Sequence, residues 1–387
     1  MRLTGLPGPS NVQQSIILDS EETINWFPVI VDAGTPKSSK VALYPTPGYE
    51  VFVQMGGAPI RALFYQDGRA FCVSGTFVYE VFASQTVTLR GSVAADANPA
   101  TITSNGTAGD QLLIVSGGFG YIYDMTANTL SSAITEPGFP ANALMGDYLD
   151  SYGLVLKANS LQFSFSTLLD FTGWNALDVN LVSQSSDNLV AMKVNHREIW
   201  LFGTKTTAVW NNTGDANVPL APIAQAYLQV GCAASFSVQQ FDNSLLWLGL
   251  NEQGARIVFR AQGYTPQRIS THAVEDYLTD LPRVSDAIAW VYQQRGHTFY
   301  SLYCPSARHT LVYDVATGMW HKRAIWDQTY MRWYPDIGRC HAYGPDFGHM
   351  VGDRQSGTIY SMNMPFRDPT SGNWRYGDLD LVITQGL

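Results

Sequence analysis

The chain has 387 residues and a formal net charge of −9, with 45% hydrophobic and only 14% charged residues. A chain of this length exceeds one compact core of ordinary size, so we expect two domains or one modular fold. The hydrophobic content excludes an intrinsically disordered protein. The 23 basic residues form no run, so the chain lacks the footprint of a protein that grips DNA through its phosphates.

The four cysteines are far apart and form no C-x-x-C pair: Cys72, Cys232, Cys304 and Cys340. In a chain of this size we interpret them as buried free thiols and not as a disulfide framework. The first residues, MRLTGLPGPSNVQQS, contain no apolar core of a signal peptide, and no apolar stretch is long enough to span a membrane. We therefore expect a soluble protein made in a reducing cytoplasm.

In chain order, the first predicted element is an extended N-terminal arm over residues 1–40, where LPGPS and GTPKSS supply Pro, Gly and Ser. A strand-like stretch, VALYPTPGYEVFVQ, follows at residues 41–54. Farther along, STHAVEDYL (270–278) is expected to form one helix, and residues 365–387 begin a separate C-terminal element or tail.

Between these segments, an apolar strand-like run recurs roughly every 40 to 50 residues, which is the period of a propeller blade. The seven runs are AFCVSG (70–75), LLIVSGG (112–118), YGLVLKA (152–158), EIWLFG (198–203), LLWLGL (245–250), TFYSLY (298–303) and GHMVGD (348–353). A strand-like stretch and a turn precede each run, and a strand with an aromatic residue follows it. The windows lack helical periodicity. The pattern predicts an all-β fold, a β-propeller of about seven four-stranded blades over residues 41–364, with six or eight blades left open.

Two distant turns share one skeleton, YIYDMTANTL (121–130) and LVYDVATGMW (311–320). Asp124 and Asp314 are expected to accept backbone hydrogen bonds across each turn, and Asn128 and Gly318 tolerate positive φ. The pair resembles the outer hairpin of kelch-type blades.

The last repeat, residues 339–363, lacks a fourth strand. We predict that residues 41–54 supply it, which would join the two ends of the chain and remove an exposed sheet edge. The predicted helix at 270–278 would then lie between the fifth and sixth blades.

Motifs that could carry chemistry are interpreted as structural. The densest cluster of metal-binding residue types, Cys340, His341 and His349, is better explained as a turn of the last blade than as a metal site. STLLDFTGW (166–174) approaches a sialidase box, but its spacing is wrong. GGFGYI (117–122) precedes a strand, whereas a phosphate-binding loop precedes a helix. We predict no catalytic, cofactor-binding or metal-binding residues, and no enzymatic activity.

The stretch ETINWFPVIVDAGTPKSSKVALYPTPGYEVF (22–52) resembles the opening of tail hub, or nozzle, proteins of short-tailed bacteriophages, the packaged-DNA-stabilisation family. The similarity lies in Asn25, Pro28 and the pair Pro47-Gly48. The segments at 186–214, 226–238, 271–278 and 304–323 follow in the order of that family.

The resemblance implies a virion structural protein that is assembled in the host cytoplasm. It implies a homo-oligomeric ring, a hexamer, below the portal and the head-to-tail adaptor ring. Such a ring extends the DNA channel, retains the packaged genome and docks tail fibres or spikes. Duplex DNA would pass through an acidic lumen without sequence-specific binding, and the arm 1–40 would reach a neighbouring subunit. The alternatives are a propeller enzyme that degrades glycans and a monomeric kelch-like binding module.

Overall fold

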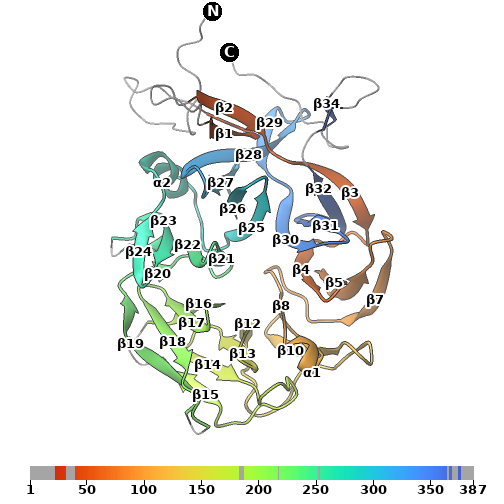
Figure 1. The fold of residues 1–387 in the computed structure, drawn as a ribbon, viewed down its shortest axis with the longest axis vertical. Coiled ribbons are helices and arrows are strands. Elements are labelled where there is room, and N and C mark those ends of the chain that lie inside the picture. The colour runs from red at the N-terminus through yellow and green to blue at the C-terminus, as the bar shows by residue number, and fades with distance from the viewer. Residues whose placement is uncertain are drawn as a thin grey trace, which may run out of the picture.

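The computed structural model describes residues 22–31, 40–182, 187–216, 218–251, 253–363, 366–367 and 374–375. In this part of the chain, seven antiparallel sheets stand around a central axis, as Figure 1 shows. The predicted seven-bladed β-propeller is therefore confirmed. No helix in the described ranges is long and apolar enough to cross a membrane.

The first four blades follow the chain, with their strands in order from the axis outward. Blade 1 contains β4 (Ile60–Gln66), β5 (Arg69–Ser74), β6 (Phe77–Val81) and β7 (Val87–Ser92). Blade 2 contains β8 (Thr101–Ser104), β9 (Gln111–Ser116), β10 (Phe119–Asp124) and β11 (Thr129–Leu130). Blade 3 contains β12 (Ala143–Leu149), β13 (Tyr152–Lys157), β14 (Gln162–Phe165) and β15 (Val179–Leu181). Blade 4 contains β16 (Leu189–Asn195), β17 (Glu198–Gly203), β18 (Thr207–Asn212) and β19 (Leu220–Leu228).

The last three blades are less regular. Blade 5 contains β20 (Gly231–Cys232), β22 (Ser244–Leu250), β23 (Arg256–Gln262) and β24 (Thr265–Arg268), and β21 (Gln239–Phe241) also pairs with β22. Blade 6 contains β25 (Ile288–Gln294), β26 (His297–Tyr303), β27 (Thr310–Asp314), β28 (Met319–Asp327) and β29 (Arg332–Pro335). Blade 7 contains β30 (Gly338–Gly344), β31 (Gly348–Asp353), β32 (Thr358–Asn363) and β3 (Gly48–Gln54).

A few elements lie outside the blades. They are the paired strands β1 (Trp26–Val31) and β2 (Lys40–Pro45), the helices α1 (Gly106–Gly109) and α2 (His272–Thr279), and the pair β33 (Phe366–Arg367) and β34 (Trp374–Arg375). Helix α2 connects blades 5 and 6 as the sequence predicts, and the Thr271 side chain accepts a hydrogen bond from the Val274 N–H at its N-terminus.

All seven recurring apolar runs are the second strands of the blades, β5, β9, β13, β17, β22, β26 and β31. In β9 the five residues Leu112–Ser116 are all buried, with no alternation between the two faces. A strand in the middle of a blade packs against the neighbouring blades on both faces, so it reads as a continuous apolar run. This double burial is what makes the repeat visible in the sequence.

The two matching turns lie between the third and fourth strands of blades 2 and 6. Asp314 accepts hydrogen bonds from the Ala316 N–H (3.0 Å) and the Thr317 hydroxyl (2.9 Å), and Asp124 accepts one from the Ala127 N–H (2.7 Å). Asn128 and Gly318 have φ values of 57° and 70°. The shared turn is confirmed.

The four cysteines are free thiols, as predicted. Cys72, Cys232 and Cys304 are buried, whereas Cys340 is only partly buried.

The predicted closure of the ring is confirmed for residues 48–54 and wrong for residues 41–45. Strand β3 pairs with β32 from Gly48–Asn363 to Gln54–Thr358 and completes blade 7. Strand β2 instead pairs with β1 along its whole length. Pro45 ends the first pairing and Pro47 lies between the two, and a proline has no N–H to continue a ladder, so the segment is divided there.

A buried ion pair stands where the two chain ends meet. The Arg323 guanidinium from β28 lies 3.6 Å from the Asp336 carboxylate and donates to the Pro47 carbonyl at 3.0 Å. Asp336 also accepts a hydrogen bond from the Tyr49 hydroxyl at 2.5 Å, and Arg323 stacks over the Tyr49 ring. Blade 6, the link to blade 7 and the closing strand are thereby held at one point.

We predict that Arg323→Met destabilises the fold by about 3–5 kcal/mol, because it leaves the buried Asp336 carboxylate without its counter-charge. The shift of the urea midpoint at pH 7 measures this. The control is Arg308→Met, because Arg308 is exposed and, among the described residues, only its backbone N–H is bonded, to the Tyr277 hydroxyl. Equal stability of the two variants would contradict a role for Arg323 in closure.

The described part of the predicted arm lies on the propeller of its own chain. Asn25 exchanges two side-chain hydrogen bonds with the backbone of Ala324, at 2.8 and 3.0 Å, and its N–H donates to the Lys322 carbonyl. Phe27 is buried between blades 6 and 7, 5.0 Å from the Phe299 ring. Residues 22–25 therefore cover the edge of β28. Residues 1–21 and 32–39 lie outside the described residues.

His321 lies beneath this arm and is 1% exposed. Its ring is 5.9 Å from Phe27 and meets Phe299 edge-on at 5.7 Å, and neither of its nitrogens has a hydrogen-bond partner among the described residues. Burial first, and then the charges of Arg323 and His297, lower the pKa of His321 to about 3. The folded protein therefore holds this ring neutral at pH values where an unfolded chain protonates it.

We predict that this histidine makes the fold acid-sensitive. The unfolded ring binds a proton below about pH 6.5 while the folded ring does not, so this contribution is complete above pH 6.5 and declines toward pH 3. At pH 5 the loss from His321 is about 2 kcal/mol. His321→Phe replaces the ring with an apolar one of similar size and should reduce the loss between pH 7 and pH 5 by that amount. Urea denaturation at both pH values measures it, and an unchanged pH dependence would contradict the prediction.

Candidate functional site

The innermost strands of all seven blades surround a small central cavity. Its volume is about 180 Å³, and its walls include residues of β4, β8, β12, β16, β21, β25 and β30. The charged side chains in the lining are Arg61, Asp147, Lys193 and Arg339. Asp147 and Lys193 form an ion pair at 3.4 Å, so the negative charge of this carboxylate and the positive charge of this ammonium group partly offset each other.

The connection between β7 and β8 closes part of one end of this cavity, and Pro99 and Ala100 contribute to the lining. Figure 1 shows this connection reaching toward the centre of the ring. Arg61 donates to the carbonyls of Asn98 (2.8 Å) and Ala94 (3.3 Å), and Arg339 donates to the Ala97 carbonyl (2.5 Å). Burial lowers the pKa of both arginines, and each remains held by backbone carbonyls.

The cavity is too small for a nucleic acid. A volume of 180 Å³ holds about six water molecules. The major groove of B-DNA alone is about 12 Å wide, and the duplex is wider than its groove, so it does not fit in a cavity of this size. A duplex therefore does not pass through the axis of one propeller. Any DNA channel built by this protein has to lie between several copies of the chain.

The motifs considered for chemistry lie apart from one another. His341 and His349 face each other on the β30–β31 hairpin, with 3.0 Å between their nearest ring nitrogens. The 166–174 segment is a connection of blade 3, in which the Trp174 indole N–H donates to the Phe171 carbonyl at 2.7 Å. The 117–122 segment is the β9–β10 turn followed by strand β10. Within the described ranges, no three His, Cys, Asp or Glu side chains gather as metal ligands.

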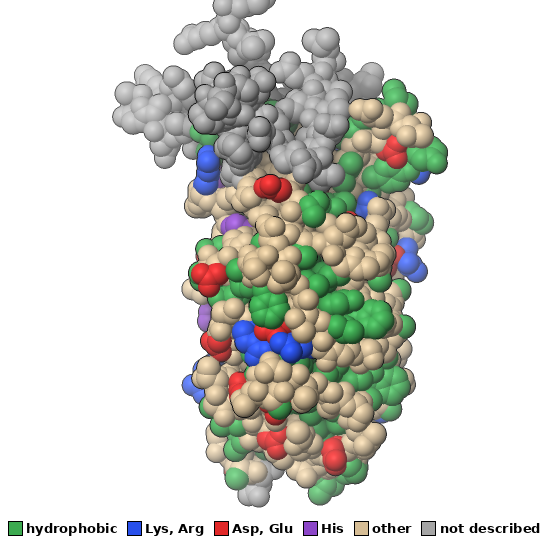
Figure 2. Space-filling view, turned by 90° about the vertical axis from the view of Figure 1, so that its right-hand side faces the viewer, with side chains coloured by type: hydrophobic (Ala, Val, Ile, Leu, Met, Phe, Trp, Pro, Cys, Tyr) green, Lys and Arg blue, Asp and Glu red, His purple; other side chains and the backbone are tan. Residues whose placement is uncertain are grey.

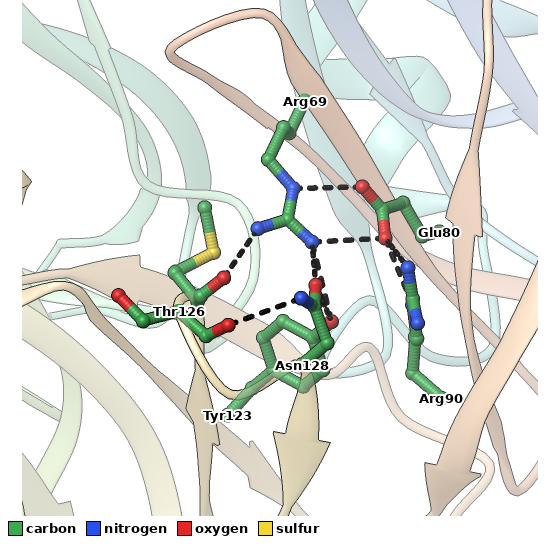
Figure 3. Close-up of polar contacts among 7 residues, drawn as sticks. Arg69, Glu80, Arg90, Tyr123, Thr126 and Asn128 are labelled. Carbon is green, nitrogen blue, oxygen red and sulfur yellow. Dashed lines mark hydrogen bonds and ion pairs between the residues drawn. The ribbon is translucent and has the colours of Figure 1, made fainter.

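A charged cluster on the outer part of blade 1 links it to blade 2 (Figure 3). Glu80 on β6 is 3% exposed and receives hydrogen bonds from Arg69 on β5 (2.7 and 2.9 Å) and from Arg90 on β7 (2.8 Å). Arg69 also donates to the Met125 carbonyl (2.7 Å) and to the Asn128 side chain (2.6 Å), in the shared turn of blade 2. One guanidinium therefore fixes the position of two blades.

Burial opposes ionisation of Glu80, but the hydrogen bonds from Arg69 and Arg90 outweigh it and lower the pKa of this carboxyl. The sequence reasoning did not identify these residues. A signal was present, because Glu80 interrupts the otherwise uncharged strand FVYEV. A charge in a buried strand usually has a partner.

The side of the ring that contains blade 1 carries charged side chains only in small separate groups (Figure 2). Hydrophobic and uncharged side chains cover most of the visible surface between them. Phe77, Leu89 and Phe119, all on strands of blades 1 and 2, are 45%, 54% and 51% exposed. Such a surface suits contacts with other proteins better than contacts with nucleic acid.

We predict that Glu80→Gln destabilises the protein by about 2 kcal/mol, because it removes the negative charge that pairs with Arg69 and Arg90. This is less than the cost of breaking a fully buried ion pair, because water reaches both arginines. The matched control is Glu50→Gln on the exposed face of β3. Thermal and urea denaturation at pH 7 compare the two variants. If both have wild-type midpoints, the cluster does not stabilise the junction of blades 1 and 2.

The fold class of the protein is a seven-bladed β-propeller with a small central cavity. The family model described as "Bacteriophage P22 Gp10, beta-propeller" matches residues 21–366. The chain belongs to this family of bacteriophage tail nozzle and stabilisation proteins, which confirms the resemblance found in the sequence. It is accordingly a phage tail protein and a virion component.

Solved structures show the same fold at low sequence identity. The extracellular domain of a hybrid two-component system from B. thetaiotaomicron aligns with a TM-score of 0.53 at 8% identity, over 83% of this chain and 40% of that one. The chain thus spans less than half the length of that structure. A streptogramin B lyase aligns with a TM-score of 0.51 at 10% identity, over 82% and 98% of the two chains. Virginiamycin B lyase from Staphylococcus aureus gives 0.51 at 9% identity, over 80% and 97%.

These identities establish the propeller fold alone, because one fold carries many unrelated functions. No curated protein matches the sequence.

Proposed function

We propose that the chain is a structural subunit of a phage tail nozzle that assembles as a homo-oligomeric ring, a hexamer, below the portal and adaptor. In this position the ring extends the DNA channel, retains the packaged genome and docks tail fibres or spikes. Residues 1–40 would act as an arm and residues 365–387 as a C-terminal element, on either side of the propeller. The proposal includes no catalytic activity and no cofactor.

The observation that carries the ring is the family match over residues 21–366, taken with the size of the central cavity. A nozzle has to pass a duplex, and this propeller cannot pass one along its own axis. The channel must then be enclosed by several subunits standing side by side. The sparse charge on the side of the propeller supports this, because burying few charged groups keeps the desolvation cost of a subunit interface low.

The formal net charge of −9 supports a lumen that DNA traverses without adhering. Each phosphate contact that is avoided removes a salt-dependent binding contribution. Genome retention in this proposal follows from a continuous protein wall around the channel, and not from grip by basic side chains.

Electron microscopy of the purified protein, alone and mixed with a purified adaptor ring, tests assembly. We expect closed rings, or collars attached to the adaptor, with a central opening wide enough for a duplex. Single discs at every concentration and no attachment to the adaptor would favour the monomeric binding module instead.

We predict that labelled duplex DNA shows negligible retention by the protein at about 150 mM salt, where most non-specific phosphate contacts are already weakened. Fluorescence anisotropy measures it, with a basic DNA-binding protein as the positive control. Micromolar binding that falls steeply with salt would contradict the acidic-lumen part of the proposal. Ring formation in the microscope would remain an independent result.

A further inference from the structure

Two of the most deeply buried basic side chains in the described part of the chain lack a counter-charge. The basic side chains classed as buried are Arg61, Lys322, Arg323 and Arg339. Arg323 lies 3.6 Å from the Asp336 carboxylate, and Lys322 lies 2.6 Å from that of Glu22. Arg61 and Arg339, which are 2% and 7% exposed, have no carboxylate of the described residues within 4.0 Å. Buried charges are normally paired, so these two guanidiniums require a partner of another kind.

The two unpaired guanidiniums lie close together at the central cavity. Arg61 is on β4 of blade 1 and Arg339 is on β30 of blade 7, and both side chains line the cavity. Both donate to carbonyls of residues 94–98 in the β7–β8 connection, so they meet over one short segment. Burial first, and then the charge of Arg339, lower the pKa of Arg61, while Asp96 acts in the opposite direction. Like charges in a buried position repel each other, and an anion beside both relieves that repulsion.

Each of these side chains also has an N–H group without an acceptor. Arg61 Nη2 and Arg339 Nε are buried and have no hydrogen-bond partner among the described residues. Trp290, on β25 of blade 6, lines the same cavity, is 3% exposed, and has no partner there for its indole Nε1. The innermost strands of blades 6, 7 and 1, which follow one another around the ring, thus each contribute a side chain with an unsatisfied donor. A buried donor without an acceptor costs free energy.

The charges around the cavity identify the kind of acceptor that is needed. Three basic side chains line it with one acidic side chain, Asp147, which is already paired with Lys193. The two unpaired guanidiniums therefore leave two positive charges without compensation in the lining. Asp96 is not among the lining residues, and its carboxylate accepts hydrogen bonds from Asn98 at 3.1 Å. Water would satisfy the N–H groups but brings no charge, so an anion fits this site better than water.

We propose that the central cavity binds one inorganic oxyanion of the phosphate or sulfate type, held by Arg61 and Arg339 with Trp290 as a further donor. The planar guanidinium fork matches the spacing of the oxygens in such an ion, and hydrogen bonds between charged groups are the strong ones. An oxyanion presents acceptor oxygens in several directions, as donors from three blades require. The cavity of about 180 Å³ holds about six water molecules, so one ion of this size fits.

The bound ion joins two blades that have no direct ion pair at this point. Arg61 and Arg339 belong to the first and the last blade, and both also hold the connection that covers one end of the axis. An anion shared by the two arginines offsets their repulsion and links both blades to that connection. The site concerns the axis of a single propeller, so it does not depend on the proposed nozzle.

The experiment counts oxyanions bound to the full chain, purified in a chloride buffer at pH 7.4. Ion chromatography of the denatured protein measures any phosphate or sulfate that was carried through purification. Equilibrium dialysis of the folded protein against radiolabelled inorganic phosphate measures what it then takes up. We expect the two amounts together to reach one ion per chain. Sulfate should displace the phosphate, and chloride at the same ionic strength should not.

Three variants test the proposed donors. Arg61→Gln and Arg339→Gln should each weaken phosphate binding about tenfold or more, because each removes a charged hydrogen-bond donor. Trp290→Phe keeps an aromatic ring and removes one neutral donor, so we expect a loss of about threefold. Arg308→Gln is the matched control, because it removes the same charge from an exposed position.

A wild-type total well below one ion per chain would overturn the proposal, whether or not any variant folds. Equal phosphate affinity in the wild type and in both arginine variants, with folding checked by circular dichroism, would overturn it as well, because the ion would then bind elsewhere. Rings that contain no oxyanion would reject this inference alone and leave the proposed nozzle intact.

Discussion

The pairing of residues 48–54 with residues 358–363 is the constraint on which the rest of the structure depends. A circular array of sheets has no stable end, because an unfinished blade exposes a row of unpaired backbone groups and a bare apolar face. Here the closing strand comes from the opposite end of the chain. Arg323, Asp336 and Tyr49 fix the junction with an ion pair, a hydrogen bond and a cation–π contact in a buried position. Closure therefore couples residues 48–54 to the last two blades.

Once the ring is closed, the size of its axis is set by the innermost strands and cannot adapt much. Side chains of seven strands fill it to about 180 Å³, and Arg61 and Arg339 hold the β7–β8 connection across one end. The centre of this propeller thus behaves as a packed core with a small cavity. The proposed nozzle function then depends on the outer surfaces and on association between copies, whereas a propeller enzyme would have its site in the central mouth.

The blades are joined to one another by different means around the ring. Between blades 1 and 2 the Arg69–Glu80–Arg90 cluster reaches the Asp124–Asn128 turn, while between blades 6 and 7 aromatic rings surround Phe27 of the N-terminal segment. The junction of blades 1 and 2 depends on the ionised carboxylate of Glu80, and the junction of blades 6 and 7 depends on the neutral ring of His321. Both lose stability in acid, since Glu80 must be deprotonated and His321 must stay uncharged in the folded state.

The sequence by itself determined the blade repeat, a helix at 270–278 (α2 in the structure) and the two matching turns, because each depends on local physics. A strand buried on both faces is a continuous apolar run, and Asp124 and Asp314 cap turns only three or four residues long. It also indicated that a strand from residues 41–54 completes the last blade, because the last repeat was one strand short. Only the tertiary structure decided that residues 40–45 turn back onto β1, that Arg61 and Arg339 meet over one connection, and that His341 faces His349 at 3.0 Å. Those contacts join residues whose spacing along the chain carries no signal, because the register of a hairpin and the closure of the ring bring them together.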